Sequence, residues 1–294
     1  MKARRKFRLK LRSQTLTLGE RTLVMGVLNV TPDSFSDGGK FDQPEAAIER
    51  ALAMESEGAD VLDIGGESTR PGAEETSAAE ELDRILPVLE GLRGRLKIPL
   101  SVDTRRAAVA ELAIRAGAEM INDVSGLRTD ARLAEVVAKN GVGVILIHMR
   151  GEPRTMQRGP FARNVMKDVV NGLRQSVAMA RKAGVEKTQI ILDPGIGFGK
   201  SFAQNYELIE KLPRLAALGY PLLVGTSRKG FLGATLARDG KPVPPEGRIW
   251  GTAATVTASI LGGAHIVRVH DVAEMVQVAR VADCVVQPSP RARK

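Results

Sequence analysis

The sequence predicts an α/β fold, a single (β/α)8 TIM barrel with a short N-terminal β-hairpin. Apolar runs of strand length alternate with amphipathic or Ala-rich stretches of helix length, about every 30 residues. Most of these runs are apolar throughout, which is typical of parallel strands covered on both faces. Eight such units fit one closed barrel, so the 294 residues do not have to be divided into two domains.

Each predicted strand is followed by its own helical pattern, and several helices are expected to stop at a Gly. An open doubly wound sheet is the alternative. However, no G-x-G-x-x-G follows the first strand, and no G-x-x-x-x-G-K-[ST] occurs anywhere in the chain. The predicted strands are 23–29, 61–65, 99–103, 119–123, 143–148, 190–195, 221–226 and 265–270, and the clearest helices are 44–59, 77–92, 105–118 and 165–184.

The segment before the first strand, FRLKLRSQTLTLGERT (7–22), is expected to form a hairpin that closes the bottom of the barrel. The predicted organisation is therefore a basic tail and hairpin at 1–21, a barrel at 22–286 and a basic C-terminal tail at 287–294.

The net charge of +9 comes from the two ends of the chain. Residues 1–12 hold seven Lys or Arg and no acid, and residues 291–294 hold three more, which leaves 33 basic against 34 acidic residues. Nucleic-acid binders usually present a basic face on the fold, often with aromatic residues interleaved, and aromatics are only 3% here. We therefore expect solvated basic ends and no nucleic-acid partner.

No apolar segment follows the basic N-terminus, so a secretory signal is not expected. The single cysteine, Cys284, excludes an internal disulfide and is expected to be core filler in a cytoplasmic protein. The uncharged run 249–267 contains Thr, Ser, Gly and His residues and is too polar for an isolated membrane span, so we expect a buried helix that leads into a strand and no membrane partner.

Polar residues close nearly every predicted strand. The C-terminal ends of barrel strands form the rim that holds barrel active sites, so these residues are expected to surround one cup. Taken alone, Asp63 or Asp123 has a simpler interpretation as the N-cap of the next helix. The strand ends carry Asn29, Asp63, Asp103, Asn122 with Asp123, His148, Asp193 and Arg268 with His270, and the loop after the seventh strand carries Ser227, Arg228 and Lys229.

The expected cup has an acceptor half and a cationic half. Asp103, Asn122 and Asp193 suit a flat heterocycle with N–H groups along one edge. Neither zinc nor serine chemistry is indicated, because there is no His-Glu-x-x-His, no Cys cluster and no Gly-x-Ser-x-Gly elbow, and His265 is expected to be structural. The cationic donors, suited to phosphates or a carboxylate, are Arg70, Lys229, Arg268 and His270.

Eight segments resemble the motifs of the dihydropteroate synthase family, and the resemblance extends over all eight units, roughly residues 22–285. It implies the same barrel. The segments are MGVLNVTPDSFSDGG (25–39), DIGGESTRPGA (63–73), SVDT (101–104), INDVSG (121–126), HMRGEPRTMQ (148–157), DPGIGFGK (193–200), SRKGFLG (227–233) and RVHDV (268–272).

The resemblance implies a transferase of folate biosynthesis that joins 6-hydroxymethyl-7,8-dihydropterin pyrophosphate to p-aminobenzoate and releases pyrophosphate. By the same resemblance, Asn29 is expected to bind Mg²⁺, which bridges it to the phosphates. The implied catalytic residues are Asp103, Lys229, Asn29, Arg268 and His270. The implied pterin contacts are Asp103, Asn122, Asp193, Lys229, Met149, Phe198 and Gly225. The implied pyrophosphate contacts are Asn29, Thr69, Arg70, Arg268 and His270, and the implied p-aminobenzoate contacts are Phe35, Asp37, Arg70, Pro71, Phe198, Lys229 and Gly230.

Family membership further implies inhibition by sulfonamides and a homodimer, to which a helix near 252–262 could contribute. Gly230 departs from the family, whose members often carry a side chain there, and we expect activity to persist, with weaker p-aminobenzoate binding as one outcome. Two alternatives stay open. A pterin-binding methyltransferase barrel would use no pyrophosphate, and a silent pterin-binding paralogue would lack the complete loops and rim residues.

Overall fold

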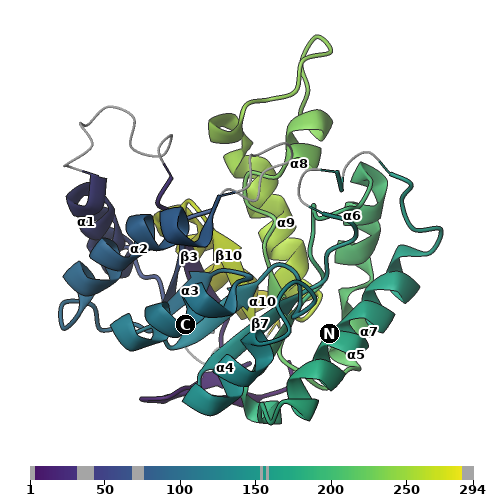
Figure 1. Ribbon diagram of the computed structural model, residues 1–294. Helices are drawn as coiled ribbons and strands as arrows, with labels where there is room; N and C mark the ends of the chain where they lie inside the picture. Colours follow the sequence, from purple (N-terminus) through teal and green to yellow (C-terminus); the bar gives the residue numbers. More distant parts are fainter. Residues whose placement is uncertain (1–3, 32–42, 68–75, 153–154, 157–158, 287–294) are drawn as a thin grey trace.

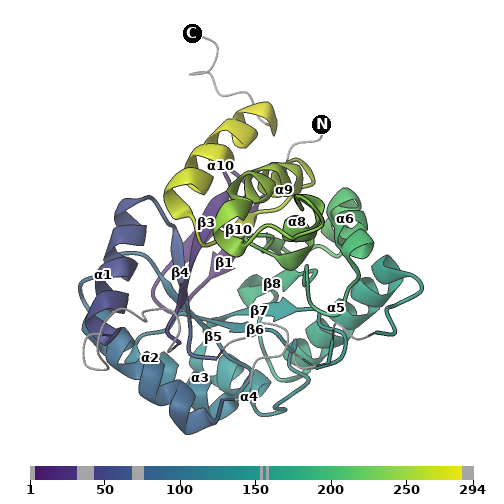
Figure 2. The same ribbon diagram turned by 90° about the horizontal axis from the view of Figure 1, so that it is seen from above.

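The computed structural model describes residues 4–31, 43–67, 76–152, 155–156 and 159–286. Its eight-stranded parallel sheet has the order β8-β7-β6-β5-β4-β3-β10-β9, which is the chain order taken around a ring (Figure 2). A parallel bridge between Leu192 and Leu222 joins β8 to the segment that leads into β9. Helices surround this ring (Figure 1). The predicted (β/α)8 barrel is confirmed.

Each strand lies within two residues of its predicted bounds at either end. The largest difference is at β9, which covers only two residues of the predicted 221–226, because Pro221 offers no N–H to a ladder and the chain leaves the sheet after Val224. The hairpin strands are β1 (Phe7–Lys10) and β2 (Thr15–Leu18), and the barrel strands are β3 (Leu23–Asn29), β4 (Val61–Gly65), β5 (Leu100–Asp103), β6 (Met120–Asp123), β7 (Gly143–Ile147), β8 (Ile190–Asp193), β9 (Leu223–Val224) and β10 (Ile266–Val269).

The helices follow the strands as expected. Two of them begin with a reciprocal capping box, Ser77 with Glu80 and Ser201 with Gln204, which satisfies backbone N–H groups at the helix start. The α-helices are α1 (Gln43–Ser56), α2 (Ala78–Leu92), α3 (Ala107–Ala116), α4 (Leu133–Asn140), α5 (Val165–Lys182), α6 (Phe202–Glu210), α7 (Leu212–Ala216), α8 (Gly230–Thr235), α9 (Ile249–Leu261) and α10 (Val272–Val286).

The inside of the barrel changes character along its axis. Alternate residues of each strand share a face, so one set of positions runs inward from the start of each strand to its end. Near the strand starts these positions are apolar and form one buried cluster, which includes Leu23, Met25, Val61, Met120, Ile145, Ile191, Leu223 and Ile266. The same alternation reaches polar residues near the strand ends: Asn29, Asp63, Asp103, Asn122, Asp193 and Arg268.

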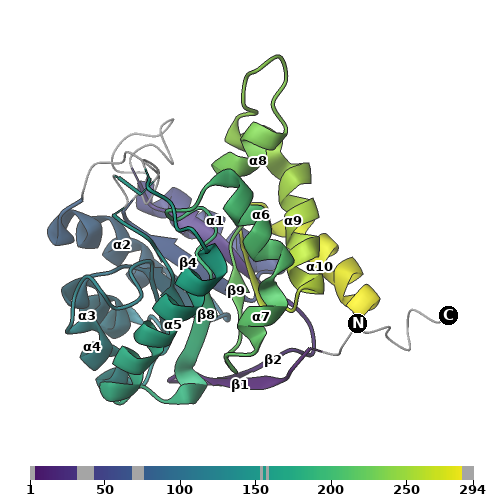
Figure 3. The ribbon, with the colours of Figure 1, turned by 90° about the vertical axis from the view of Figure 1, so that its right-hand side faces the viewer.

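The hairpin closes the bottom of the barrel, as predicted. Strands β1 and β2 pair antiparallel beneath the barrel, at the end opposite α8 (Figure 3). Leu9, Leu11 and Leu18 are buried there and belong to the interior cluster. Gly143 makes room for this closure, because a Cβ atom at this position would lie 3.0 Å from a methyl of Leu11 and 2.9 Å from Cγ of Met120.

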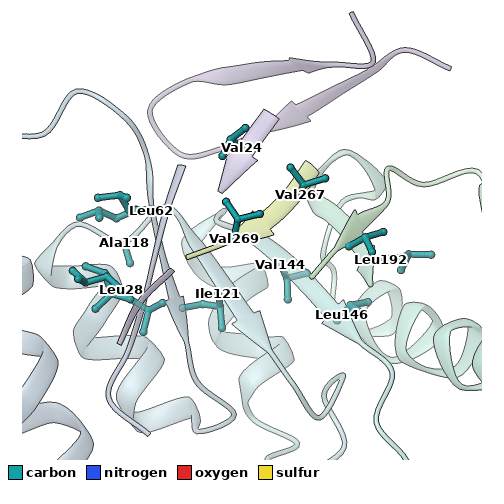
Figure 4. Close-up of a cluster of buried hydrophobic side chains, with 14 of the residues drawn as sticks. Val24, Leu28, Leu62, Ala118, Ile121, Val144, Leu146, Leu192, Val267 and Val269 are labelled. Carbon is teal, nitrogen blue, oxygen red and sulfur yellow. The ribbon is translucent and has the colours of Figure 1, made fainter. Parts of the chain in front are cut away.

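The outward-facing residues of the strands form a second, larger core against the helices. Figure 4 shows its centre, where Val24, Leu62, Val144 and Val267 belong to one buried cluster. Both faces of the sheet are therefore covered, which explains the continuous apolar runs in the sequence.

The prediction of a solvated basic N-terminus is wrong for Arg4, whose side chain is 4% exposed. Its guanidinium donates to the hydroxyl of Thr22 and to the carbonyl of Ala264, and it pairs with Asp283 of α10. The first described residues thus belong to the fold.

Two smaller expectations have opposite outcomes. His265 is structural, as expected, because it is buried and its Nδ1 accepts a hydrogen bond of 3.1 Å from the backbone of Leu222. Cys284 is exposed on α10, so the prediction that it fills the core is wrong. Among the described residues, no helix is long and apolar enough to cross a membrane.

Candidate active site

A cavity of about 560 Å³ opens at the C-terminal ends of the barrel strands. The rim side chains reach it because each strand continues its inward alternation to its last residue. Nine of the predicted contact residues line the cavity: Asn29, Asp103, Asp193, Phe198, Gly225, Lys229, Gly230, Arg268 and His270. Ser227 and Arg228 of the predicted rim line it as well.

Two residues predicted to bind the pterin do not line this cavity. Asn122 is fully buried beside Asp63, and Met149 is buried in the interior apolar cluster. The remaining predicted site residues, Phe35, Asp37, Thr69, Arg70 and Pro71, lie outside the described residues.

Arg268 of β10 crosses the cavity to two carboxylates. Its Nε donates to Oδ2 of Asp63 at 2.6 Å, and its Nη2 donates to Oδ2 of Asp103 at 2.9 Å. The same oxygen of Asp63 accepts a hydrogen bond of 2.8 Å from Nδ2 of Asn122. Asp63 thus fixes both Arg268 and Asn122 from below.

The pKa of the Asp103 carboxyl group is subject to opposing influences. Burial raises the pKa of its carboxyl group to about 7, although the positive charge of Arg268 acts in the opposite direction. Neighbouring acids, first of all Asp63, raise the pKa further. For Arg268, burial alone would lower the pKa, but the two carboxylates outweigh it and the pKa is raised. Arg268 therefore keeps its charge, and Asp103 is poised between its two protonation states.

Asp193 is the second desolvated carboxylate. It ends β8, is 4% exposed and accepts a hydrogen bond of 2.6 Å from the backbone N–H of Gly195. Burial raises its pKa to about 6, and the Gly195 N–H and the cations Lys229, Lys200 and Arg268 limit that rise. Asp193 is therefore mostly ionised at pH 7 and can accept hydrogen bonds from a ligand.

The loop after β9 turns sharply to deliver Lys229. Arg228 has a left-handed backbone with φ of 58°, which is uncommon for a residue with a side chain. Its conformation is held on three sides: its N–H donates to Thr252, its carbonyl accepts from Arg248, and its guanidinium pairs with Asp271. Such local strain persists where the surroundings enforce it, often at functional sites.

Lys229 lies over an aromatic ring. Its Nζ is 4.0 Å from the centre of the Phe198 ring, a cation–π distance. Burial and the neighbouring Arg268 lower the pKa of Lys229 to about 8. The ammonium is still mostly charged at pH 7, and it faces the cavity beside Asp193.

His270 also lines the cavity, beside the cations. Its Nδ1 lies 3.0 Å from the hydroxyl of Ser227, which also accepts a hydrogen bond from the backbone N–H of His270. Burial and the charges of Arg268, Arg228 and Lys229 lower the pKa of His270 to about 3. Its imidazole is therefore neutral at pH 7.

Two functional positions, Asp63 and Lys200, were misread or missed from the sequence. Asp63 has a simple capping interpretation in the sequence, but its carboxylate points inward to Arg268. Asp123, in contrast, does order the loop that follows it, because it accepts hydrogen bonds from the N–H groups of Ser125 and Leu127. Lys200 stands in a quoted motif yet was given no role, since nothing in the motif reveals that its ammonium is buried. Because alternate residues of a strand share a face, the inward position of Val61 could have identified Asp63 as inward-facing too.

Charged contacts join the end of β4 to the start of α2. Arg106 pairs with Glu67, just after β4, and donates to the carbonyl of Thr76, just before α2. It also pairs at 2.5 Å with Glu81 of α2, whose side chain is fully buried.

Within the described ranges, no three His, Cys, Asp or Glu side chains are grouped to hold a metal ion. Asn29, however, brings an amide oxygen to the cavity wall. Magnesium commonly takes only one or two protein oxygens and completes its shell with water and substrate phosphates, so this donor is compatible with it.

Comparison with known proteins agrees with this site. A family model described as "Pterin binding enzyme" matches residues 25–270. The dihydropteroate synthase of Synechocystis sp. is 50% identical over 265 residues, which cover 90% of each chain.

Solved structures extend the similarity to three dimensions. Xanthomonas albilineans dihydropteroate synthase with 4-aminobenzoic acid has 44% identity and a TM-score of 0.89, covering 97% of this chain and 100% of that one. Yersinia pestis dihydropteroate synthase with a sulfonamide drug complex has 44% identity and a TM-score of 0.88, covering 95% and 99%. This chain therefore belongs to the pterin-binding enzyme family and, within it, to the dihydropteroate synthases.

Proposed function

We propose that the protein transfers the pterin methylene group of 6-hydroxymethyl-7,8-dihydropterin pyrophosphate to the amine of p-aminobenzoate, giving 7,8-dihydropteroate and pyrophosphate. One observation carries this: two desolvated carboxylates, Asp103 and Asp193, and two cations, Lys229 and Arg268, converge on one cavity of about 560 Å³. A flat heterocycle with N–H donors fits the carboxylates, and its charged leaving group fits the cations.

Asp193 and Asp103 would hold the pterin from two sides. The ionised Asp193 accepts hydrogen bonds from the amine and ring N–H groups, while Asn122, placed next to Asp103 in the β5–β6 register, would need a small side-chain movement to join them. The Oδ1 of Asn122 is buried without a hydrogen-bond partner, so it is available for a donor on the ligand.

The chemical step separates charge. The C–O bond between the pterin methylene and pyrophosphate breaks with its electron pair on oxygen, and the arylamine nitrogen forms the new C–N bond and then loses a proton. Asp103 faces the positive charge that develops on the pterin, and Arg268 faces the growing negative charge on pyrophosphate. His270 and Ser227 offer further hydrogen bonds to phosphate oxygens.

We further propose that Asn29 binds Mg²⁺ together with the pyrophosphate. When bound, the metal would neutralise and orient the leaving group. The support from this chain is Asn29, which lines the cavity and carries an amide oxygen that can bind a metal ion. Thr69 and Arg70 are proposed as further pyrophosphate contacts; both lie outside the described residues.

p-Aminobenzoate is proposed to bind above the pterin. Phe198 offers an aromatic face, Lys229 a cation, and Gly230 begins α8 at the cavity wall. An arylamine is already nucleophilic when neutral, so the site needs no strong base. The other proposed contacts lie outside the described residues; they are Phe35, Asp37, Arg70 and Pro71. Since sulfonamides share the arylamine shape, competitive inhibition by them is part of this proposal.

A homodimer is also proposed. Large apolar side chains are exposed on neighbouring helices late in the barrel: Trp250 is 80% exposed on α9, and Val281 is 68% exposed on α10. Burial of these residues by a second copy would remove apolar surface from water. A single cysteine fits a reducing compartment, and we propose that the enzyme works in the cytoplasm.

The function is tested with the purified chain, both substrates and Mg²⁺. We expect pyrophosphate release that depends on p-aminobenzoate, together with formation of dihydropteroate. Pterin binding without pyrophosphate release would identify a silent paralogue instead, and methyl transfer from methyltetrahydrofolate would identify a methyltransferase. Either result would overturn the proposal.

A further inference from the structure

Lys200 is a buried lysine whose ammonium group is completely satisfied inside the protein. Its side chain is among the largest that are fully buried, and the residue is 1% exposed. The three N–H groups meet three acceptors: the carbonyl of His148 at 2.8 Å, Nδ1 of His148 at 2.9 Å and the carbonyl of Phe198 at 3.0 Å. Buried lysines are rare unless they are paired in this way.

These contacts join two neighbouring strand ends. His148 directly follows β7, and Phe198 lies in the loop that follows β8. Glycines allow the two backbones to approach: a Cβ at Gly195 would lie 1.8 Å from the carbonyl oxygen of His148, and one at Gly199 would lie 2.1 Å from that of Arg150. Both glycines have φ of 69°, where other residues are strained. Between these closely spaced backbones, the Lys200 ammonium donates to the carbonyl groups of His148 and Phe198.

The joined loop carries the cavity wall. It begins at Asp193, whose carboxylate is held by the N–H of Gly195, and it presents Phe198 beneath Lys229. Lys200 itself lies at the edge of the cavity, but its three N–H groups are directed at the protein acceptors. It is therefore placed to act on Asp193 and Phe198 and not on a ligand.

The His148 side chain is ordered by the same ammonium. Its Nδ1 accepts from Lys200, so the ring proton lies on Nε2, 3.6 Å from Oδ2 of Asp168 on α5. Burial and the charge of Lys200 lower the pKa of His148 to about 2, which keeps the ring neutral. Burial lowers the pKa of Lys200 to about 7, and Asp193 and Asp168 act in the opposite direction.

We propose that Lys200 is a positioning residue for the reaction: by joining the end of β7 to the loop after β8, it sets the Phe198 platform and the Asp193 carboxylate at the spacing that the pterin requires. This inference rests on the proposed function. A purely structural role would instead affect folding alone.

The test compares Lys200→Met with Lys211→Met. Lys211 lies at the end of α6 and pairs with Glu207 on the surface, so its removal leaves the site untouched. For Lys200→Met we expect a folded protein whose KM for the pterin pyrophosphate is raised about tenfold or more, while kcat falls less than about threefold. Lys211→Met should keep both constants.

A double-mutant cycle with Phe198→Leu shows whether Lys200 acts through the platform. If it does, Lys200→Met should raise KM much less in the Phe198→Leu background, because the two changes share one effect. Lys200→Gln keeps two N–H donors and should recover part of the affinity for the pterin pyrophosphate. If Lys200→Met does not fold, Lys200→Gln takes its place in the experiment.

Unchanged KM in the folded Lys200 variants, or fully additive effects with Phe198→Leu, would overturn the inference. Failure of the proposed function looks different, because wild type and Lys211→Met would then release no pyrophosphate at all.

Discussion

At one end of the barrel the inward side chains are Leu, Ile, Val and Met packed on a hairpin, and at the other end they are Asp, Asn, Arg and His around a cavity. Both ends use the same strands and the same alternation. The apolar end is closed, and Leu9, Leu18 and Met25 there are almost completely buried. The polar end keeps buried atoms without partners, including Oδ1 of Asp63 and Oδ1 of Asn122.

The contrast separates stability from function. Apolar burial at the closed end lowers the free energy of the folded state, whereas desolvated carboxylates at the open end raise it. Substitutions at the closed end should therefore lower stability and leave activity nearly unchanged, whereas substitutions at the open end should lower activity without lowering stability.

The largest effect is expected for Asp193→Asn, which removes the desolvated carboxylate at the open end. We expect kcat/KM for the pterin pyrophosphate to fall about 10³-fold, because an amide cannot accept from donors as a carboxylate does. Stability should instead rise, by about 1–3 kcal/mol at pH 7. Chemical denaturation and initial rates measure the two. Glu111→Gln, on an exposed ion pair of α3, is the control and should change neither.

The stability gain of Asp193→Asn should also depend on pH. The folded pKa of Asp193, about 6, lies above its ordinary value of 3.8, so the wild type loses stability as pH rises through that interval. The gain should therefore be absent near pH 3.8 and complete above pH 6. A gain that does not depend on pH would contradict this origin.

The closed end should show the reverse signature. Leu9→Ala removes a side chain that is 1% exposed, and we expect a loss of about 2–4 kcal/mol in the free energy of unfolding, with kcat at 25 °C nearly unchanged. Leu112→Ala on α3, at a site 38% exposed, is the matched truncation and should cost little. A folded Leu9→Ala protein without activity would show that the two ends are coupled.

A smaller effect is expected from pH. In the proposed site, pterin binding needs ionised carboxylates, and burial raises the pKa of Asp103 to about 7 and that of Asp193 to about 6. As pH falls, kcat/KM should drop about tenfold per pH unit between these two values and up to about a hundredfold per pH unit below both, because two protonations then oppose binding. In Asp193→Asn this limb should lose one of its two protonation steps. A profile that stays flat from about pH 5 to about pH 8 would contradict the assignment.

The smallest effect is expected for Gly230→Ser, which adds a side chain at the position expected to depart from the family motif. Among the described residues, no heavy atom beyond the adjacent chain lies within 4 Å of where a Cβ would stand at Gly230. We expect an unchanged melting temperature and a change of less than about threefold in KM for p-aminobenzoate. A larger change would mean that this side chain contacts the ligand directly.

Much of the fold could be predicted because each β/α unit can be recognised from its own local sequence pattern. Strands β3 and β4 have their predicted bounds, since apolar runs end at Asn29 and at Gly65. The two-residue β9 could not be predicted, because Pro221 and the turn at Arg228 limit the strand through local geometry and not through composition.

The site was predictable as a set of residues and not as a network. The strand ends indicate that Asp103, Asp193 and Arg268 meet, yet nothing in the sequence says that Arg268 is shared between Asp63 and Asp103. The proposed role of Lys200 depends on its contacts with His148, which lies 52 residues earlier in the sequence. Such contacts arise only when the barrel closes.

The hairpin under the barrel has a consequence for traffic through the enzyme. With Leu9, Leu11 and Leu18 sealing the lower end, the cup has one opening, and every molecule that enters or leaves must pass it. In the proposed site the pterin binds deepest, against Asp103 and Asp193, so we expect it to arrive first and depart last. A compulsory order of addition, visible in initial-rate patterns, would then follow from a floor sealed at the end of the barrel opposite the chemistry.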